Sequence, residues 1–172
     1  MSMTNLQEIF EHHLPYEISM LIATFQRLEP GVTDVVISNA LIESFCIHAR
    51  SLLDFFQDKQ GVGASVFCRA AHVAFAGGSP PDDLIRKLNT QIAHLTLRRT
   101  ADSSQKIGNA DRERLVRIVS AELARLIPNL KPEYASGWAK HWHSPTVTVS
   151  PIAATTNAPL SMIVNLSAKR DV

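Results

Sequence analysis

The chain has 172 residues, of which 45% are hydrophobic and 19% are charged, with a formal net charge of +1 at pH 7. These proportions are typical of a globular protein and exclude an intrinsically disordered chain. The length fits one domain with a substantial core, and no apolar run approaches the roughly 20 residues that a transmembrane helix needs. We therefore expect a single soluble domain with no membrane partner.

The N-terminal residues carry Glu8 and Glu11 and lack the basic start and apolar centre of a signal peptide. We therefore expect a cytoplasmic location. Cys46 and Cys68 fit that compartment, because neither belongs to a metal-type pair and Cys46 lies in an apolar segment. We expect both thiols to be reduced and inert.

Apolar residues at helical spacing predict a first helix that Pro15 opens and that Pro30-Gly31 ends. The next helix, running to about Asp58 with Thr33 or Asp34 as its N-cap, is expected to be the longest. Its inward stripe consists of Leu41, Ile42, Phe45, Ala49, Leu52, Leu53 and Phe56. Residues 61–78 predict a short helix or a packed loop that crosses the bundle.

The run Ser79-Pro80-Pro81-Asp82-Asp83 predicts the start of another helix, with Ser79 as its cap and its end near Arg99. A polar loop then leads to a helix over 111–126, followed by a short helix over 133–142. The predicted fold is all-α: an antiparallel bundle of four principal helices in one domain over residues 1–143. The segment 144–172, rich in Ser, Thr, Pro, Ala and Val, is expected to be a mobile tail.

Charge is distributed unevenly along the chain. Residues 1–60 carry three basic and eight acidic side chains, whereas residues 84–131 carry ten basic and four acidic ones. This asymmetry is compatible with solvated helix faces, with attraction between the two halves of one bundle, with a self-complementary dimer, or with a basic surface for an anionic partner.

Polar residues within the apolar helices predict a polar seam between helices. Glu43, Arg50 and Asp54 share one face of the long helix, where Arg50 and Asp54 form an i,i+4 ion pair, and His48 belongs to the same helix. On the later helix, Asn89 and His94 lie at opposite borders of the apolar stripe, and Arg98 lies on the His94 side. We expect Glu43, Arg50 or Asp54 to meet Asn89 or His94 across the bundle, because an unpaired buried charge costs several kcal/mol.

Two segments carry a family resemblance: Glu43-Ser44-Phe45-Cys46-Ile47-His48-Ala49-Arg50-Ser51-Leu52-Leu53-Asp54-Phe55-Phe56 and Leu88-Asn89-Thr90-Gln91-Ile92-Ala93-His94-Leu95-Thr96. They resemble a family of small uncharacterised bacterial proteins and, more distantly, the HEPN (higher eukaryotes and prokaryotes nucleotide-binding) helical bundles. The resemblance covers about Leu14 to Leu126. It implies a homodimer, because many HEPN proteins are ribonucleases with an Arg-x4-6-His motif at the dimer cleft.

In that comparison His94 stands in the place of the histidine of the motif. Asn89 stands five residues before it, and Arg86 lies eight residues before it, outside the usual spacing. The arginine of the motif therefore has no direct counterpart. A metal-independent ribonuclease would use His94 as acid or base and would need Arg50 or Arg98 as the cation that stabilises the phosphate.

Three functional hypotheses remain open from the sequence. The leading one is a HEPN-like binding or interaction module that acts as a homodimer or with an RNA or protein partner. The second is a metal-independent endoribonuclease of a defence or toxin type that uses His94. The third is a purely structural interaction module whose polar seam sets the helix register. We expect no cofactor, and no histidine, cysteine or carboxylate spacing predicts a metal site.

Overall fold

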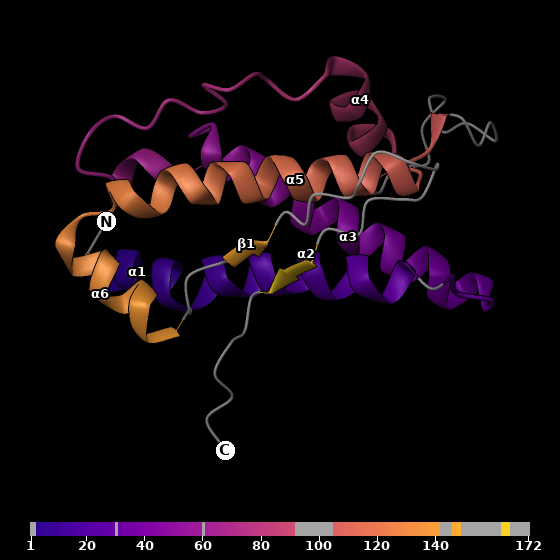
Figure 1. Cartoon of the computed structure of the whole chain (residues 1–172), viewed down its shortest axis with the longest axis horizontal. Coiled ribbons are helices and arrows are strands. Elements are labelled where there is room, and N and C mark those ends of the chain that lie inside the picture. Colours follow the sequence, from indigo (N-terminus) through magenta and orange to yellow (C-terminus); the bar gives the residue numbers. More distant parts are fainter. Residues whose placement is uncertain are drawn as a thin grey trace.

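The computed structural model describes residues 3–29, 31–59, 61–91, 105–141, 146–148 and 163–165, with side chains within 5–29, 31–59, 61–90 and 105–138. The protein is an all-α helical bundle, as its sequence predicts (Figure 1). Within these residues, no helix is both long and apolar enough to cross a membrane.

The N-terminal part is one continuous helical run, made of α1 (Met3–Glu8), a π-helical turn η1 (Ile9–His13) and α2 (Leu14–Leu28). Pro15 lies in the first turn of α2, as predicted, but the helical path begins upstream of it. A proline has no N–H group and its ring crowds the carbonyl of the residue four positions earlier, here Glu11. The wider π-helical turn directly before Pro15 relieves that crowding, so the helix continues.

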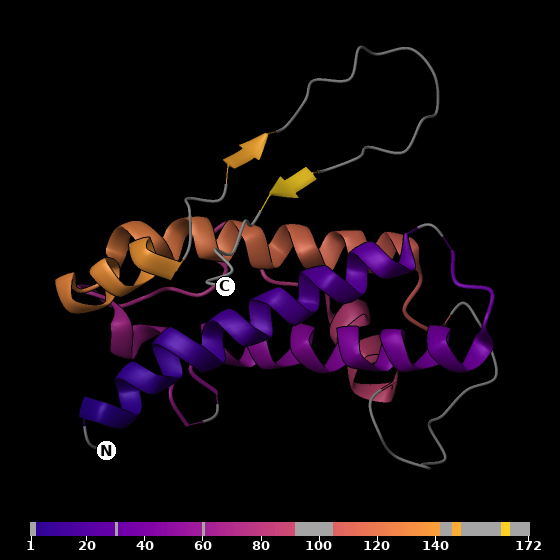
Figure 2. The same ribbon diagram turned by 90° about the horizontal axis from the view of Figure 1, so that it is seen from below.

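The longest described helix is α3 (Val35–Phe56), which runs antiparallel to α2 and crosses it obliquely (Figure 2). Asp34 is its N-cap, and its carboxylate accepts hydrogen bonds from the backbone N–H groups of Val36 (2.8 Å) and Ile37 (3.1 Å). This capping was predicted for Thr33 or Asp34, and it satisfies two N–H groups that no helical carbonyl can reach.

Residues 61–91 begin with a short 3-10 helix, η2 (Ala64–Phe67), and end with α4 (Asp82–Gln91). Between them residues 68–81, which we call the strap, run alongside α5 without regular structure (Figure 1). The predicted short helix and loop are present, but the loop runs along α5 and not across the bundle (Figure 1). The prediction of Ser79 as the cap of α4 was wrong, because the helix begins only at Asp82, directly after the two prolines. The predicted helix end near Arg99 lies outside the described residues.

The C-terminal helices are α5 (Asn109–Leu126), a 3-10 turn η4 (Ile127–Asn129) and α6 (Pro132–His141). Both helices agree with the prediction to within two residues. In the expected tail, the described residues form two short antiparallel strands, β1 (Thr146–Thr148) and β2 (Ile163–Asn165).

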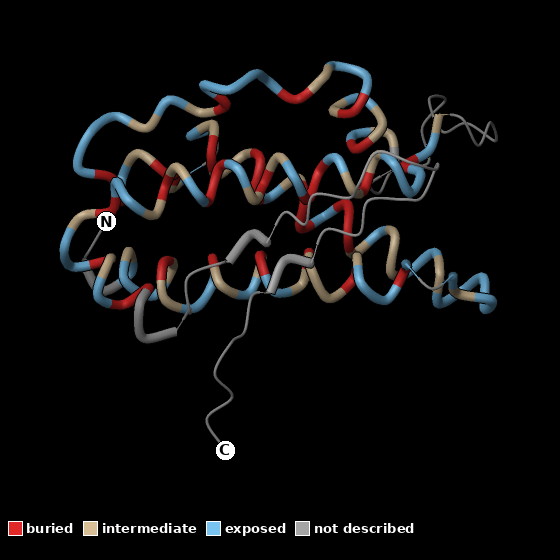
Figure 3. Tube along the Cα trace, in the orientation of Figure 1, coloured by how far each residue is buried: buried red, intermediate tan, exposed pale blue. Residues whose placement is uncertain are grey.

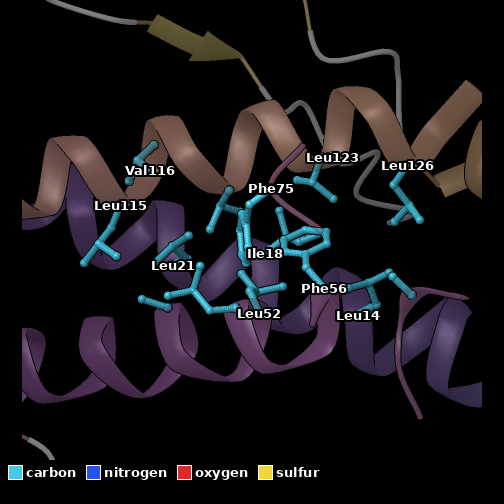
Figure 4. Close-up of a cluster of buried hydrophobic side chains, with 14 of the residues drawn as sticks. Leu14, Ile18, Leu21, Leu52, Phe56, Phe75, Leu115, Val116, Leu123 and Leu126 are labelled. Atoms are coloured by element: carbon cyan, nitrogen blue, oxygen red, sulfur yellow. The ribbon is translucent and has the colours of Figure 1, made fainter. Parts of the chain in front are cut away.

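One hydrophobic cluster extends from Phe10 to Trp138 and takes residues from α2, α3, α4, α5 and α6. Figure 3 shows the buried positions on the facing sides of these helices, and Figure 4 shows part of the cluster between α2, α3 and α5. Burying one such side chain stabilises the fold by about 1.5–3 kcal/mol. The largest fully buried side chains are Phe10, Ile18, Leu21, Phe45, Leu52, Phe56, Phe67, Leu84, Leu88, Leu115, Leu126 and Leu130.

Candidate functional site

The residues Glu43, Arg50 and Asp54 lie on the side of α3 that faces away from the core. Glu43 is exposed, and the side chain of Arg50 is 43% exposed. Arg50 Nε lies 3.6 Å from Asp54 Oδ2, which confirms the predicted i,i+4 ion pair. Because both groups reach water, this pair contributes at most a few tenths of a kcal/mol to stability.

These three residues belong to a longer stripe, which we call the outer face of α3. Its members follow each other at steps of four and three residues, the spacing that keeps side chains on one side of a helix. Apolar members are strongly exposed, with Val36 at 72% and Ile47 at 47%. The outer face of α3 consists of Val36, Ala40, Glu43, Ile47, Arg50 and Asp54.

His48 points to the inner side of the same helix and is only 7% exposed. Its Nδ1 lies 2.8 Å from Glu17 Oε2, and its ring meets the edge of Tyr16 at a centroid distance of 5.6 Å. Both partners come from the first turn of α2. The imidazole is thus held between a carboxylate and an aromatic ring, which fixes the register of α2 on α3.

Asn89 is exposed on α4. Among the described side chains, no hydrogen bond or ion pair joins it to Glu43, Arg50 or Asp54. His94 and Arg98, the other members of the predicted seam on this helix, lie outside the described residues, so the predicted contacts of His94 stay predictions.

A different polar contact holds α4 against α5. Lys87 Nζ lies 2.9 Å from Asp111 Oδ2, and the same carboxylate accepts the N–H of Gly108 at 3.1 Å. Burial alone would raise the pKa of Asp111, but the hydrogen bonds from Lys87 and Gly108 together with nearby positive charge hold that pKa below its ordinary value. The carboxylate thus caps α5 and anchors α4 at once.

The most buried carboxylate in the described structure belongs to Glu122 of α5, which is 3% exposed. It accepts a hydrogen bond from the backbone N–H of Phe75 at 3.1 Å and is bound by the guanidinium of Arg125. His72 Nε2 lies 3.5 Å from Glu122 Oε2 but makes no hydrogen bond with it. Sequence reasoning missed this cluster. Glu122 lies on the inward stripe of α5 together with Leu115, and a charged residue within such an apolar stripe could have indicated a buried polar contact.

Arg112 is a second buried polar residue that sequence reasoning missed. It is 7% exposed and donates to the carbonyl of Ile107 at 3.4 Å and to the side-chain oxygen of Asn109. Burial lowers the pKa of its guanidinium. The thiol of Cys46 lies in the same interior, where burial raises its pKa to about 12 against the opposing effect of the Arg112 charge. Such a thiol is almost never ionised near neutral pH, so Cys46 has the character of a core residue.

Taken together, the described residues define a helical bundle with polar pairs at its helix contacts and one exposed mixed face on α3. Among the described side chains, no group of three or more histidines, cysteines or carboxylates is arranged to hold a metal ion. Comparisons with known protein families, with curated proteins and with solved structures find no match for this chain.

Proposed function

We propose that the protein is a HEPN-like interaction module that forms a homodimer through the outer face of α3. The observation that carries this proposal is Ile47, a large apolar side chain that is 47% exposed at the middle of a long helix. Exposed apolar residues that line up along one helix face are typical of surfaces that bind another protein.

The charges on the outer face favour a second copy of the same chain as the partner. In an antiparallel pairing of two α3 helices about a two-fold axis near Ile47, Glu43 of each copy lies opposite Arg50 of the other. The two Ile47 side chains then pack at the centre, and two opposite-charge pairs flank them. Self-complementarity of this kind is what a two-fold interface requires, and the opposite charges fix its register.

The buried polar pairs have a structural role in this proposal. His48 and Glu17 hold α2 against α3 from the inner side, so that α3 presents a rigid outer face. Lys87 and Asp111 likewise hold α4 against α5. A rigid helix face loses little conformational entropy when it binds, which favours association.

The test measures the oligomeric state by sedimentation velocity over a range of protein concentrations. We expect a monomer–dimer equilibrium in the native protein. Ile47→Asp should raise the dimer dissociation constant about 100-fold, because it places two charges at the centre of the interface. The control is Val73→Asp, which adds the same charge to a 67% exposed valine outside α3 and should leave the equilibrium unchanged.

A charge exchange separates this interface from general loss of stability. Glu43→Arg alone should weaken the dimer, since Arg50 of the other copy then faces a like charge. Combining it with Arg50→Glu should restore the dimer. A protein that stays monomeric at every concentration, or a dimer that none of these substitutions affects, would contradict the proposal and leave an RNA or a different protein as the partner to be tested.

A further inference from the structure

Among the described side chains, Tyr16 of α2 is the only aromatic one that is exposed. It is 55% exposed, whereas the other described aromatic residues are buried or half-buried. Contact of so much aromatic surface with water is unfavourable, and tyrosine is enriched among the residues that contribute most to binding in protein interfaces. The position of Tyr16 relative to the outer face of α3 therefore bears on what this face binds.

The contacts of Tyr16 with α3 fix its level along the bundle. Its ring lies nearly perpendicular to the ring of His48, with 5.6 Å between the two centroids. The next residue, Glu17, binds the same imidazole at 2.8 Å. Because His48 directly follows Ile47 in the chain, Tyr16 lies at the level of Ile47 to within about one helical turn. This is the level of the two-fold axis in the proposed homodimer.

Tyr16 belongs to a stripe of α2, which we call the outer face of α2. Its members follow each other at steps of four and three residues, as they do on the outer face of α3. The outer face of α2 consists of Tyr16, Met20, Ala23 and Arg27, all exposed or half-buried. It is apolar over its first three members and contains no acidic residue. A second copy can therefore approach it without repulsion between carboxylates of this stripe.

The outer face of α3 by itself is small for a stable dimer. It has six members, whereas a typical stable interface buries about 800 Å² on each partner and takes roughly 20–30 residues from each side. Further surface must come from a neighbouring element. The helix α2 can supply it, because it lies against α3 and keeps its own outer face accessible (Figure 2).

Two separate observations thus indicate the same place. The pairing of Glu43 with Arg50 of a second copy puts the centre of the interface near Ile47, and the exposed aromatic residue of α2 lies beside this centre. Residues that dominate binding cluster near the centre of an interface. We propose that Tyr16 is the aromatic anchor of the homodimer and packs against α3 of the second copy beside Ile47. This role of α2 rests on the homodimer proposed above for α3.

The contacts that Tyr16 makes within its own chain favour this role. The near-perpendicular contact with His48 restricts the ring before a partner arrives, so that little side-chain entropy is lost on binding. Since Glu17 binds the same imidazole, the backbone next to Tyr16 is held against α3 as well. The aromatic ring, more than its hydroxyl group, should then determine the affinity.

Sedimentation velocity on the full chain measures the contribution of the ring. Tyr16→Ala should raise the dimer dissociation constant about 30-fold, because it removes an aromatic ring from the centre of the interface. Tyr16→Phe keeps the ring and should change the constant less than about threefold. The control is Val73→Ala, which truncates a 67% exposed side chain outside α2 and α3 and should have no effect.

A photo-cross-link separates contact with a second copy from support of the chain's own fold, and it does not depend on the alanine variant. The photoreactive residue p-benzoylphenylalanine at position 16 keeps an aromatic side chain and reacts with nearby C–H groups on irradiation. In a mixture of isotopically labelled and unlabelled chains, a cross-link between a labelled and an unlabelled peptide joins two copies. Mass spectrometry should place it within residues 40–51 of α3. The same photoreactive residue at position 73 is the control and should give no cross-link between copies.

The outcomes distinguish the anchor from the homodimer itself. If Ile47→Asp separates the copies while Tyr16→Ala leaves the dissociation constant unchanged and no cross-link reaches α3 of a second copy, Tyr16 is not part of the interface. The homodimer through α3 then stands without α2. If the native protein is a monomer at every concentration, both the anchor and the homodimer are overturned.

Discussion

The carboxylates of Glu17 and Glu122 differ in how deeply they are buried and in the groups that they contact. Glu17 remains 28% exposed and meets one imidazole, His48, whereas Glu122 is 4% exposed at its side chain and meets a guanidinium and a backbone N–H. Because an unpaired buried carboxylate is costly, the depth of burial sets how many partners each must have. Removing Arg125 should therefore be more harmful than removing His48.

The contact between Glu17 and His48 should be measurable as a coupling energy. In a double-mutant cycle with Glu17→Gln and His48→Gln, we expect a favourable coupling of about 1 kcal/mol in the free energy of unfolding. The matched control is the exposed hydrogen bond between Gln7 and Glu11, 2.8 Å long, which should give less than about 0.5 kcal/mol. Equal coupling in the two cycles would show that the buried pair does not fix the helix register.

At the scale of elements, an acid defines the start of α3 and the start of α5. Asp34 caps α3 through two backbone N–H groups, and Asp111 in the first turn of α5 accepts the N–H of Gly108. Both contacts are favourable because a helix start carries a partial positive charge and backbone N–H groups without a helical partner. Asp111 differs in that it also binds Lys87 of α4, so that it links two helices.

The role of Asp111 predicts a pH dependence. Its pKa is lower in the folded protein than in the unfolded chain, so its stabilisation is complete above the ordinary carboxyl range, near pH 4. That stabilisation is lost as the pH falls through the folded pKa. Asp111→Asn should therefore lower the melting temperature by roughly 3 °C at pH 7, for a loss of about 1 kcal/mol, and by progressively less below about pH 4.

Thermal unfolding followed by circular dichroism at several pH values checks this. Glu29→Gln is the control, because Glu29 is exposed at the end of α2 and should show no comparable loss. A deficit in Asp111→Asn that stays constant down to pH 3 would mean that the carboxylate charge does not stabilise the fold.

For the whole molecule, the acidic half (residues 1–60) and the basic half (residues 84–131) do not contact each other through their opposite charges. Among the described residues, no ion pair joins residues 1–60 to residues 84–131; each pair lies within one half or involves His72. The halves meet through apolar side chains of the common core. Apart from the buried Arg112 and Glu122, the described charges of the two halves thus lie at the surface, where they can act on a second copy or on an anionic partner.

If the protein is an interaction module, as proposed, and not the alternative ribonuclease, it should not cleave RNA. Native protein incubated with RNA in the presence of a chelator should leave the RNA intact, and His94→Ala should behave in the same way. Chelator-resistant cleavage that disappears in His94→Ala would instead favour the metal-independent ribonuclease. In that case Arg50→Ala, which removes one of the two cations considered for the phosphate, should lower the rate as well.

The helices could be predicted from the sequence because their causes are local. Apolar residues at helical spacing and the cap at Asp34 act within a few residues of the place where they appear. The errors were also local. The helical run before Pro15 depends on a π-helical turn that no sequence pattern indicated. Ser79 is not the cap of α4, because Pro80 and Pro81 separate it from the first residue of the helix, Asp82.

The candidate site was less accessible to sequence reasoning. The spacing of Glu43, Arg50 and Asp54 indicated a shared face of α3, and their ion pair was predicted from it. The same spacing could not tell that this face points away from the core, because the neighbouring helices decide that. The partner of His48 could not be predicted either, since Glu17 lies 31 residues away in the chain.

The sequence by itself determined an all-α bundle, most of its helix boundaries, and the residues that share each helix face. Those properties follow from short-range backbone hydrogen bonding and from the period of the apolar residues. Only the tertiary structure decided which polar residues are buried and what they meet: His48 with Glu17, and Glu122 with Phe75 of the strap. The reason is that burial of a polar group depends on the packing of distant segments, which local spacing does not encode.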